Sequence, residues 1–271
     1  MQIMPKVAQM QPIPIVIIRW YQSKLVSVVS EWQRITVSML DTGIIEDVNR
    51  QFRIDDALSE FNSVMVDLQS SFNATMPSVA DYAEQAYGRT DLVHKTRWKQ
   101  IVQETYGISP FLYEQWQSGF IRAFVDDNVA LMKNLSEDTA KKISQNVIGG
   151  ARSGIRASEI AKNIKNDFKV SKTRARLIAR DQVSKLYGQL NMHRQSDAGI
   201  SRYIWSTSDD DRVRKTHGEN DDKIMQWKNS NVELSNGRWV TRTGYKGIPG
   251  QDIQCRCVAL AVMPDEYQPF S

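Results

Sequence analysis

Both cysteines of this 271-residue sequence lie near its C-terminal end, in the segment GIPGQDIQCRCVALAV, where one residue separates Cys255 from Cys257. A disulfide between them would be strained, because a span from i to i+2 is too short for disulfide geometry. Two interpretations remain open. The thiols could form half of a metal site, or they could be small, apolar residues on the buried face of a strand.

A structural zinc site needs four ligands in tetrahedral geometry. The sequence offers two thiolates, His217 and a carboxylate, for which the candidates are Asp209, Asp211 and Asp252. The cysteine spacing is not that of a zinc knuckle, so we favour packed thiols, no bound cofactor and a hydrogen bond from His217 to a carboxylate. In that interpretation Arg256 points away from the core and pairs with an acidic loop residue such as Asp211.

The segment DDDRVRKTH places the acidic residues Asp209 to Asp211 shortly before His217. Such a cluster could hold a divalent cation, as in nucleases. It could equally form a turn in which Asp side chains bind loop backbone groups and Arg side chains clamp carboxylates. The sequence has no phosphate-binding Walker loop and no Gly-x-Ser-x-Gly elbow. We therefore predict no enzymatic activity, with a metal-dependent nuclease or delivered effector enzyme that uses His217 and Asp209–Asp211 as the alternative.

Positive charge is concentrated in residues 140–190, which hold twelve Lys and Arg against three Asp and Glu, a net charge of +9 in a chain whose total is +4. A basic segment favours a polyanionic partner. The candidate DNA contacts are Lys162, Lys165, Lys169, Lys172, Arg174, Arg176 and Arg180. Arg174 and Arg176 are two positions apart and do not share a helical face. A solvated surface, or salt bridges to an acidic protein, is the open alternative.

Apolar spacing predicts an α+β protein with a mainly helical N-terminal half and a small helix-plus-antiparallel-sheet C-terminal domain. We expect helices over residues 20–40, 44–68, 78–87, 90–105, 110–133, from 136 to the glycines near 150, 157–167 and 171–199. Serines 109, 136 and 171 are the expected helix-start signals. The alternating segments SRYIWSTS, GRWVT and QCRCVALAV predict strands, with polar loops between them.

The first 19 residues are expected to form an extended arm that docks on a partner surface. The apolar run from Ile13 to Ile18 is too short to span a bilayer, which needs about 20 apolar residues, and no signal peptide is expected. The low cysteine content fits an intracellular folding site.

Two parts of the C-terminal segment resemble the signature of the phage Mu F-like minor head protein family. In that family a Trp-Thr/Ser stretch precedes an Asp-x-Arg-Val-Arg-x-x-His core, and Pro-Gly and Cys-Arg-Cys follow downstream. The matching residues are Trp205, Asp211, Arg212, Arg214, His217, Pro249, Gly250, Cys255, Arg256 and Cys257. The resemblance covers about residues 140–265. The chain departs from the family at Asp221-Asp222, where members often carry Asp-Gly, and this puts the shape of that loop in question.

The resemblance implies a structural protein of a tailed phage, made in the host cytoplasm and located inside the phage head near the portal. It implies the portal protein and packaged double-stranded DNA as partners, with major capsid and scaffold proteins as further candidates. The expected organisation is an arm over residues 1–19, a helical portal-docking region over 20–135 and a Mu F-like head morphogenesis domain over 136–271.

Overall fold

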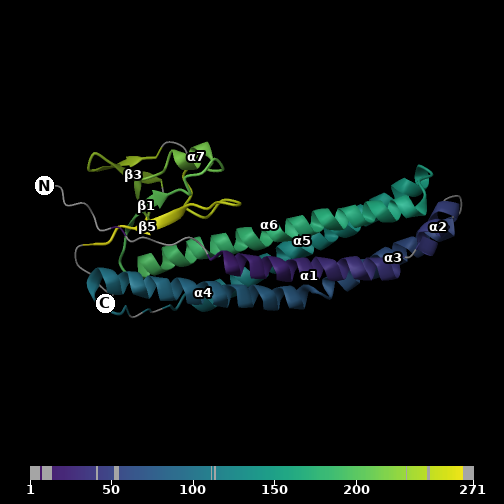
Figure 1. The fold of residues 1–271 in the computed structure, drawn as a ribbon, viewed down its shortest axis with the longest axis horizontal. Helices are drawn as coiled ribbons and strands as arrows, with labels where there is room; N and C mark the ends of the chain where they lie inside the picture. The colour runs from purple at the N-terminus through teal and green to yellow at the C-terminus, as the bar shows by residue number, and fades with distance from the viewer. Residues whose placement is uncertain are drawn as a thin grey trace. The chain divides into compact units, whose positions relative to one another are not determined.

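The computed structural model describes residues 7, 14–40, 42–51, 55–110, 112, 114–229, 231–242 and 245–264. It confirms the predicted α+β class. The helices are α1 (Ile15–Met39), α2 (Thr42–Gln51), α3 (Asp55–Asn73), α4 (Met76–Tyr106), α5 (Gln117–Arg152), α6 (Ala157–Asp197) and the short α7 (Lys215–Gly218). The strands are β1 (Arg202–Ser206), β2 (Ile224–Gln226), β3 (Val232–Ser235), β4 (Arg238–Thr241) and β5 (Val258–Ala261), and Figure 1 follows all of these elements along the chain.

The chain divides into two compact units, each discontinuous in sequence. One contains residues 18–85 and 121–180 and is called here the helical unit. The other contains residues 1–17, 86–120 and 181–271 and is called the sheet unit. Helices α4 and α6 contribute to both units, and the boundary predicted between residues 135 and 136 lies inside α5.

The helical unit buries aromatic side chains between its helices. Trp32 of α1 stacks on Phe72 of α3 with ring centroids 5.2 Å apart, and its indole N–H donates to the Thr75 hydroxyl. Tyr21 of α1 donates to Asn128 of α5, and all four of Trp32, Phe72, Tyr21 and Asn128 are completely buried. These apolar contacts with satisfied polar ends hold the helices together.

The predicted helix breaks at residues 88–89, 134–135 and 168–170 are wrong, because α4, α5 and α6 run through them without interruption. Two of the expected caps have another role. Ser136 is buried inside α5, where its hydroxyl donates to the Lys133 carbonyl, and Ser171 is buried inside α6, where it hydrogen-bonds Thr139 of α5. A serine that satisfies its hydroxyl in this way continues a helix instead of starting one.

The remaining differences concern helix ends. The helix predicted from Pro110 begins only at Gln117, and the helix predicted over 44–68 is divided between α2 and α3. Helix α1 begins at Ile15, directly after Pro14, so residues 15–19 of the predicted arm are helical. Within that arm Val7 forms an antiparallel bridge with Val262, whereas residues 1–6 and 8–13 lie outside the described part of the chain.

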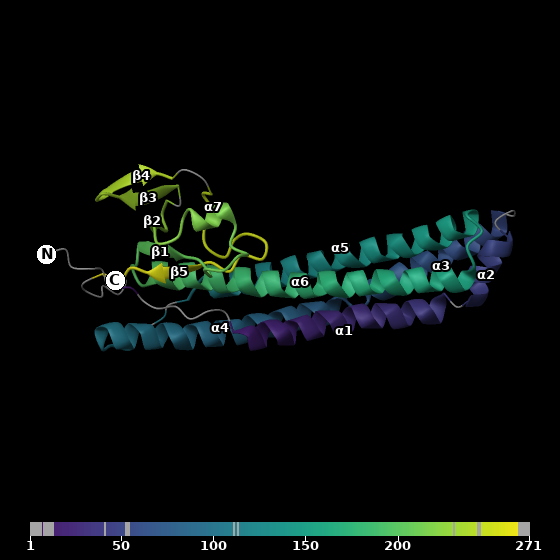
Figure 2. The same cartoon turned by 45° about the horizontal axis from the view of Figure 1, so that its top comes forward.

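The sheet unit is built on a five-stranded antiparallel sheet with the order β4-β3-β2-β1-β5 (Figure 2). On β1, Tyr203 lies opposite Met225 of β2 and Ala261 of β5, and all three are completely buried. Strands β2 and β3 lie where the sequence predicted polar loops. The predicted strand over residues 254–262 is shorter than expected, because β5 begins at Val258 and leaves both cysteines in the irregular segment before it.

Candidate functional site

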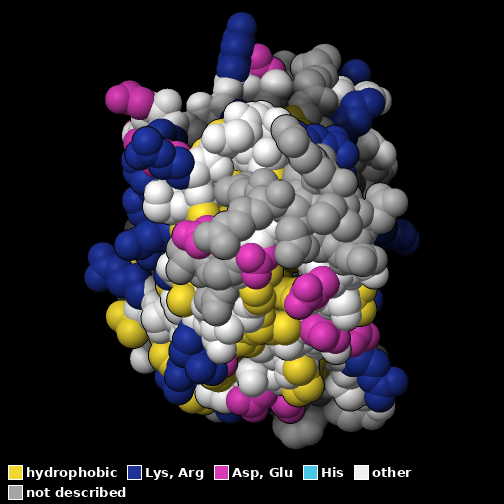
Figure 3. All heavy atoms as spheres, turned by 90° about the vertical axis from the view of Figure 1, so that its right-hand side faces the viewer, with side chains coloured by type: hydrophobic (Ala, Val, Ile, Leu, Met, Phe, Trp, Pro, Cys, Tyr) yellow, Lys and Arg dark blue, Asp and Glu magenta, His cyan; other side chains and the backbone are white. Residues whose placement is uncertain are grey.

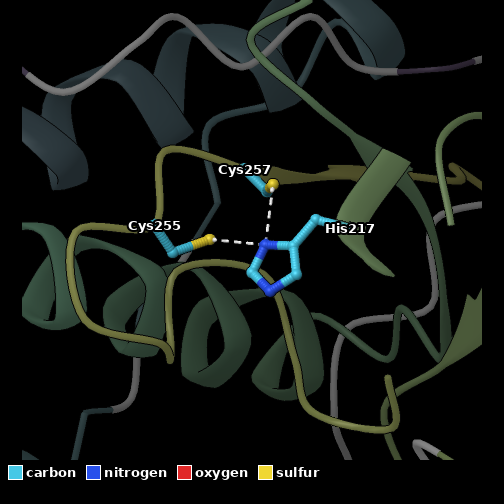
Figure 4. Close-up of side chains that lie close together, drawn as sticks. All are labelled: His217, Cys255 and Cys257. Carbon is cyan, nitrogen blue, oxygen red and sulfur yellow. Dashed lines mark hydrogen bonds between the residues drawn. The ribbon is translucent and has the colours of Figure 1, made fainter. Parts of the chain in front are cut away.

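The side chains best suited to bind a metal or to do chemistry lie close together in the sheet unit. His217 lies on α7, and its Nδ1 atom is 3.5 Å from the sulfur of Cys255 and 3.6 Å from the sulfur of Cys257 (Figure 4). One candidate ligand atom from each of the three residues lies within 4.8 Å of the others, and all three side chains are buried. Residues about 40 positions apart in the sequence therefore form a compact Cys2His cluster.

The opposite side of the His217 ring is held by a carboxylate. Its Nε2 atom lies 3.1 Å from Asp252, and the hydroxyl of Tyr245 donates to the other oxygen of that carboxylate over 2.6 Å. Burial raises the pKa of Asp252, but the hydrogen bonds from Tyr245 and His217 outweigh it and hold this pKa below its usual value. An ionised carboxylate only accepts hydrogen bonds, so Nε2 carries a proton, and in the neutral imidazole Nδ1 then presents its lone pair to the two sulfurs.

The surroundings of the two thiols favour one thiolate. The hydrogen bond from Cys257 lowers the pKa of Cys255 to about 5, and the backbone N–H groups of Cys257 and Gly250 also donate to its sulfur. The pKa of Cys257 is raised, first by this same hydrogen bond and then by burial, while the indole N–H of Trp205 acts in the opposite direction. The thiolate is the form of cysteine that binds metals.

Arg256, between the two cysteines, points away from them. Its guanidinium makes two hydrogen bonds to the carboxylate of Asp210, which is the acidic partner in place of the expected Asp211. These bonds hold the pKa of Asp210 well below its usual range. Arg214 donates to the Ile253 carbonyl over 2.7 Å, so two arginines connect the acidic loop and α7 to the cysteine segment.

Helix α6 contacts the cysteine segment and the turn before it at two positions, Asp181 and Gly188. The Asp181 carboxylate of α6 accepts from the backbone N–H of Gln254, a residue with the positive φ of 57°. Pro249 and Gly250 pack against Gly188 of α6, where an added Cβ would lie 3.0 Å from the Pro249 carbonyl oxygen. The absence of a side chain at Gly188 therefore allows the close approach of this turn.

Aromatic rings complete the surroundings of the cluster. Trp205 of β1 is completely buried and meets His217 edge-on at 5.6 Å between ring centroids, and Tyr245 lies 4.6 Å from the same imidazole. The guanidinium of buried Arg242 lies 5.5 Å from the Trp205 ring centroid and donates to the carbonyls of Tyr245 and Gly247. The site is thus closed by aromatic groups and fixed by hydrogen bonds.

Not every residue of the predicted motif takes part. Asp211 and Arg212 are exposed on the loop, and neither ring nitrogen of His217 bonds to the Asp209–Asp211 segment. Tyr245 and Gly188 were not among the predicted site residues, and Asp210 was predicted only as part of the Asp209–Asp211 cluster. An isolated glycine inside a helical pattern was a usable signal for close packing at Gly188. Nothing local in the sequence indicated Tyr245.

The candidate DNA contacts belong to the first half of α6, in the helical unit. Lys162, Lys165, Lys169 and Arg176 are exposed. Lys172 donates to Gln33 of α1 over 2.7 Å, and Arg174 makes an ion pair with Asp138 of α5 at 2.8 Å. Arg180 is only partly exposed. Lys172 and Arg174 thus contact neighbouring helices, although Arg174 is itself exposed.

The fold and the site define an α+β protein in which a Cys2His cluster joins a short helix to the segment that leads into an edge strand. Residues 141–260 match the family described as "Phage Mu protein F like protein". The match confirms, over these residues, the resemblance to the phage Mu F-like family read from the sequence.

The chain is also 32% identical over 148 residues to an uncharacterized protein of Haemophilus influenzae (strain ATCC 51907 / DSM 11121 / KW20 / Rd). The alignment covers 55% of this chain and 30% of that relative, so the chain spans less than a third of the relative's length. No solved structure matches the chain.

Proposed function

We propose that this protein acts in phage head morphogenesis as a minor capsid component that docks at the portal inside the head and contacts packaged DNA. The observation that carries the proposal is the Mu F-like match over residues 141–260. A role in assembly also fits the geometry, because the motif residues hold each other in place through hydrogen bonds and buried rings. None of the described helices is long and apolar enough to cross a bilayer.

The exposed basic residues of α6 form one stripe, which is the feature that supports DNA contact. Lys162, Lys165, Lys169 and Arg176 follow each other at intervals of three, four and seven positions, so they share a face of the helix. At a rise of 1.5 Å per residue this stripe extends about 21 Å. Arg174 lies on the opposite side, where Asp138 neutralises it. Among the described residues Lys165, Lys169 and Arg176 form no ion pair, whereas Lys162 pairs with Glu159 at 3.4 Å, so three of the four charges are unpaired and available to a polyanion.

The face drawn in Figure 3 offers less support for binding a polyanion. The face in Figure 3, seen from the right-hand side of Figure 1, carries Lys and Arg side chains, but acidic and hydrophobic side chains are interspersed with them. A mixed surface of this kind is ordinary for a folded protein. We therefore base the proposal of DNA contact on the stripe.

The salt dependence of binding to duplex DNA tests this part of the proposal. Four phosphate contacts give a slope of about −3.6 in a plot of log binding constant against log salt concentration. Replacing Lys162, Lys165, Lys169 and Arg176 together by glutamine should bring the slope close to zero, measured by fluorescence anisotropy with a labelled duplex. Arg174→Gln, on the same helix, is the matched control and should leave the slope unchanged. Equal slopes for the quadruple variant and the wild type would refute DNA contact through this stripe.

Docking at the portal is supported by apolar side chains that remain exposed at the start of α1. Ile15 is 54% exposed and Val16 is 73% exposed, although both have large hydrophobic side chains. We expect the chain to co-elute with the portal protein of the same phage in size-exclusion chromatography, and Val16→Asp to weaken this complex. Val240→Asp, at an exposed position on β4, is the matched control. Co-elution that Val16→Asp leaves intact would move the docking surface elsewhere, and no co-elution at all would refute docking.

The geometry gives less support to the nuclease alternative. His217 directs one nitrogen to the thiols and the other to Asp252, while Asp210 is bound by Arg256. A divalent cation at Asp209–Asp211 would therefore lack the histidine on which that alternative depended. A nuclease assay with Mg²⁺ on the purified chain should show no cleavage above that of His217→Asn.

A further inference from the structure

The geometry points to a zinc site at Cys255, Cys257 and His217, with Asp252 as the group that orients the histidine and with a water molecule as the fourth ligand. This inference rests on the arrangement of the described side chains and does not depend on portal docking or DNA contact. Its ligand is a soft divalent cation that favours thiolate and imidazole in tetrahedral geometry.

The distances between the three candidate ligand atoms match those around a tetrahedral zinc ion. With a zinc–sulfur distance of about 2.3 Å and a zinc–nitrogen distance of about 2.0–2.1 Å, a tetrahedral ion separates a ligating nitrogen from a ligating sulfur by about 3.6 Å. The observed distances from His217 Nδ1 are 3.5 Å to Cys255 and 3.6 Å to Cys257. Both nitrogen–sulfur edges of the tetrahedron are thus already present. All three ligand atoms lie within 4.8 Å, against about 3.8 Å required for two sulfurs on one zinc ion.

The Nδ1 atom of His217 has two sulfur neighbours. Nδ1 of a neutral imidazole has a single lone pair and can accept one hydrogen bond. Two thiols nevertheless face it at nearly equal distances, as the two dashed lines in Figure 4 show. A cation placed between the three atoms satisfies the lone pair and both sulfurs at once. As packed thiols, only one of the two sulfurs could donate to this nitrogen, and the other would have the neighbouring sulfur as its partner.

Asp252 and Tyr245 hold the side of the His217 ring that faces away from the sulfurs. A zinc-ligating histidine commonly donates its other ring N–H to a carboxylate, which fixes the tautomer and the ring orientation. Asp252 occupies this place at 3.1 Å from Nε2, and Tyr245 fixes the carboxylate in turn. The surroundings are therefore those of a metal site even at atoms that would not touch the metal.

Loading of the full, reduced chain with Co²⁺ tests the site directly. Tetrahedral Co²⁺ in place of zinc gives visible d–d bands and a near-ultraviolet thiolate-to-cobalt band, whose intensity follows the number of thiolate ligands. We expect about one metal ion per chain, and elemental analysis of the protein as purified should find zinc at the same ratio. Cys255→Ser and Cys257→Ser should each lose about half of the charge-transfer intensity, as one of two thiolates is removed.

Two further variants separate ligands from orienting groups. His217→Asn should abolish tight binding, whereas His193→Asn, a histidine that stacks on Trp116 in the same unit, should not change it. Asp252→Asn should retain the spectrum but weaken binding by about 10–100-fold, as expected for an outer-shell partner. Asp211→Asn, exposed on the neighbouring loop, is its matched control and should bind like the wild type.

The wild type alone can overturn the inference, even if every variant fails to fold. No zinc in the purified protein and no charge-transfer band in reduced chain with native circular dichroism would show that the thiols are packed core groups. Wild-type affinity in His217→Asn would assign any binding to the thiols alone and would equally refute the site. A melting temperature that falls in the presence of a chelator would support it, because the metal binds only the folded chain.

Discussion

Replacing Arg194 by methionine should destabilise the sheet unit severely, because this arginine joins three segments through a buried ionic cluster. Its guanidinium is completely buried and lies 2.5 Å from Asp91 of α4 and 2.7 Å from Glu114 of the segment before α5. The third partner is His94, whose Nδ1 accepts from Arg194 over 2.9 Å. Arginine only donates hydrogen bonds, so this histidine is neutral.

The expected loss follows from what methionine leaves behind. Each hydrogen bond to a charged group contributes about 1.5–3 kcal/mol, and removal of one partner of a buried ion pair costs about 3–5 kcal/mol. Lys95 still pairs with Glu114 at 2.6 Å, so the main uncompensated charge is Asp91, which is only 13% exposed. We therefore expect the free energy of unfolding to fall by about 3–5 kcal/mol.

Urea denaturation followed by tryptophan fluorescence measures this loss, since Trp98 and Trp116 lie in the same unit. Arg238→Met on exposed β4 is the matched control and should change the free energy by no more than about 0.5 kcal/mol. In a double-mutant cycle, Glu114→Gln should cost less in the Arg194→Met background than in the wild type, because the two side chains interact. A loss below about 1 kcal/mol for Arg194→Met would refute the view that this cluster holds the unit together.

Three further predictions concern pH and packing. Burial lowers the pKa of His94 well below its usual value. The free energy of unfolding should therefore be at its full value above about pH 6.5 and fall by up to about 1.4 kcal/mol per pH unit below it. Urea titrations at several pH values should show a smaller dependence on pH for His94→Gln. Burial raises the pKa of Glu114, but hydrogen bonds from Lys95 and Arg194 lower it more, so a second loss should follow below about pH 4.3 and disappear in Glu114→Gln. Gly188→Ala should destabilise, because its Cβ would meet the Pro249 carbonyl at 3.0 Å, whereas Gly149→Ala, with open space around it, should stabilise its helix by about 0.5–1 kcal/mol in thermal melts.

The sequence predicted the helical class and the position of β1 well, since apolar spacing and aromatic alternation are local signals. It failed at helix continuity. Ser136 and Ser171 have the residue type of a cap, but distant partners set their role. Gln69 lies 67 positions from Ser136, and Thr139 lies 32 positions from Ser171. No local pattern can distinguish a serine that caps a helix from one that bonds across two helices.

The candidate site shows the same division between local and distant information. The sequence identified Cys255, Cys257 and His217, because their residue types and order are visible in the chain. It could not establish that one nitrogen of His217 faces both sulfurs while the other faces Asp252. That arrangement depends on where α7 is held against the cysteine segment. Arg214 and Ile253 supply part of this restraint through a contact across 39 positions.

Cys255, Arg256 and Cys257 alternate in direction as predicted, although the strand predicted there begins only after them. Cys255 and Cys257 were expected to point inward from a strand with Arg256 pointing outward, yet β5 begins only at Val258. The alternation is nevertheless present, because successive side chains of an extended backbone point to opposite sides whether or not a neighbouring strand pairs with it. The backbone N–H groups of Gly250 and Cys257 donate to the Cys255 sulfur. The two faces of three consecutive residues thereby hold a Cys2His cluster on one side and the Asp210 carboxylate on the other.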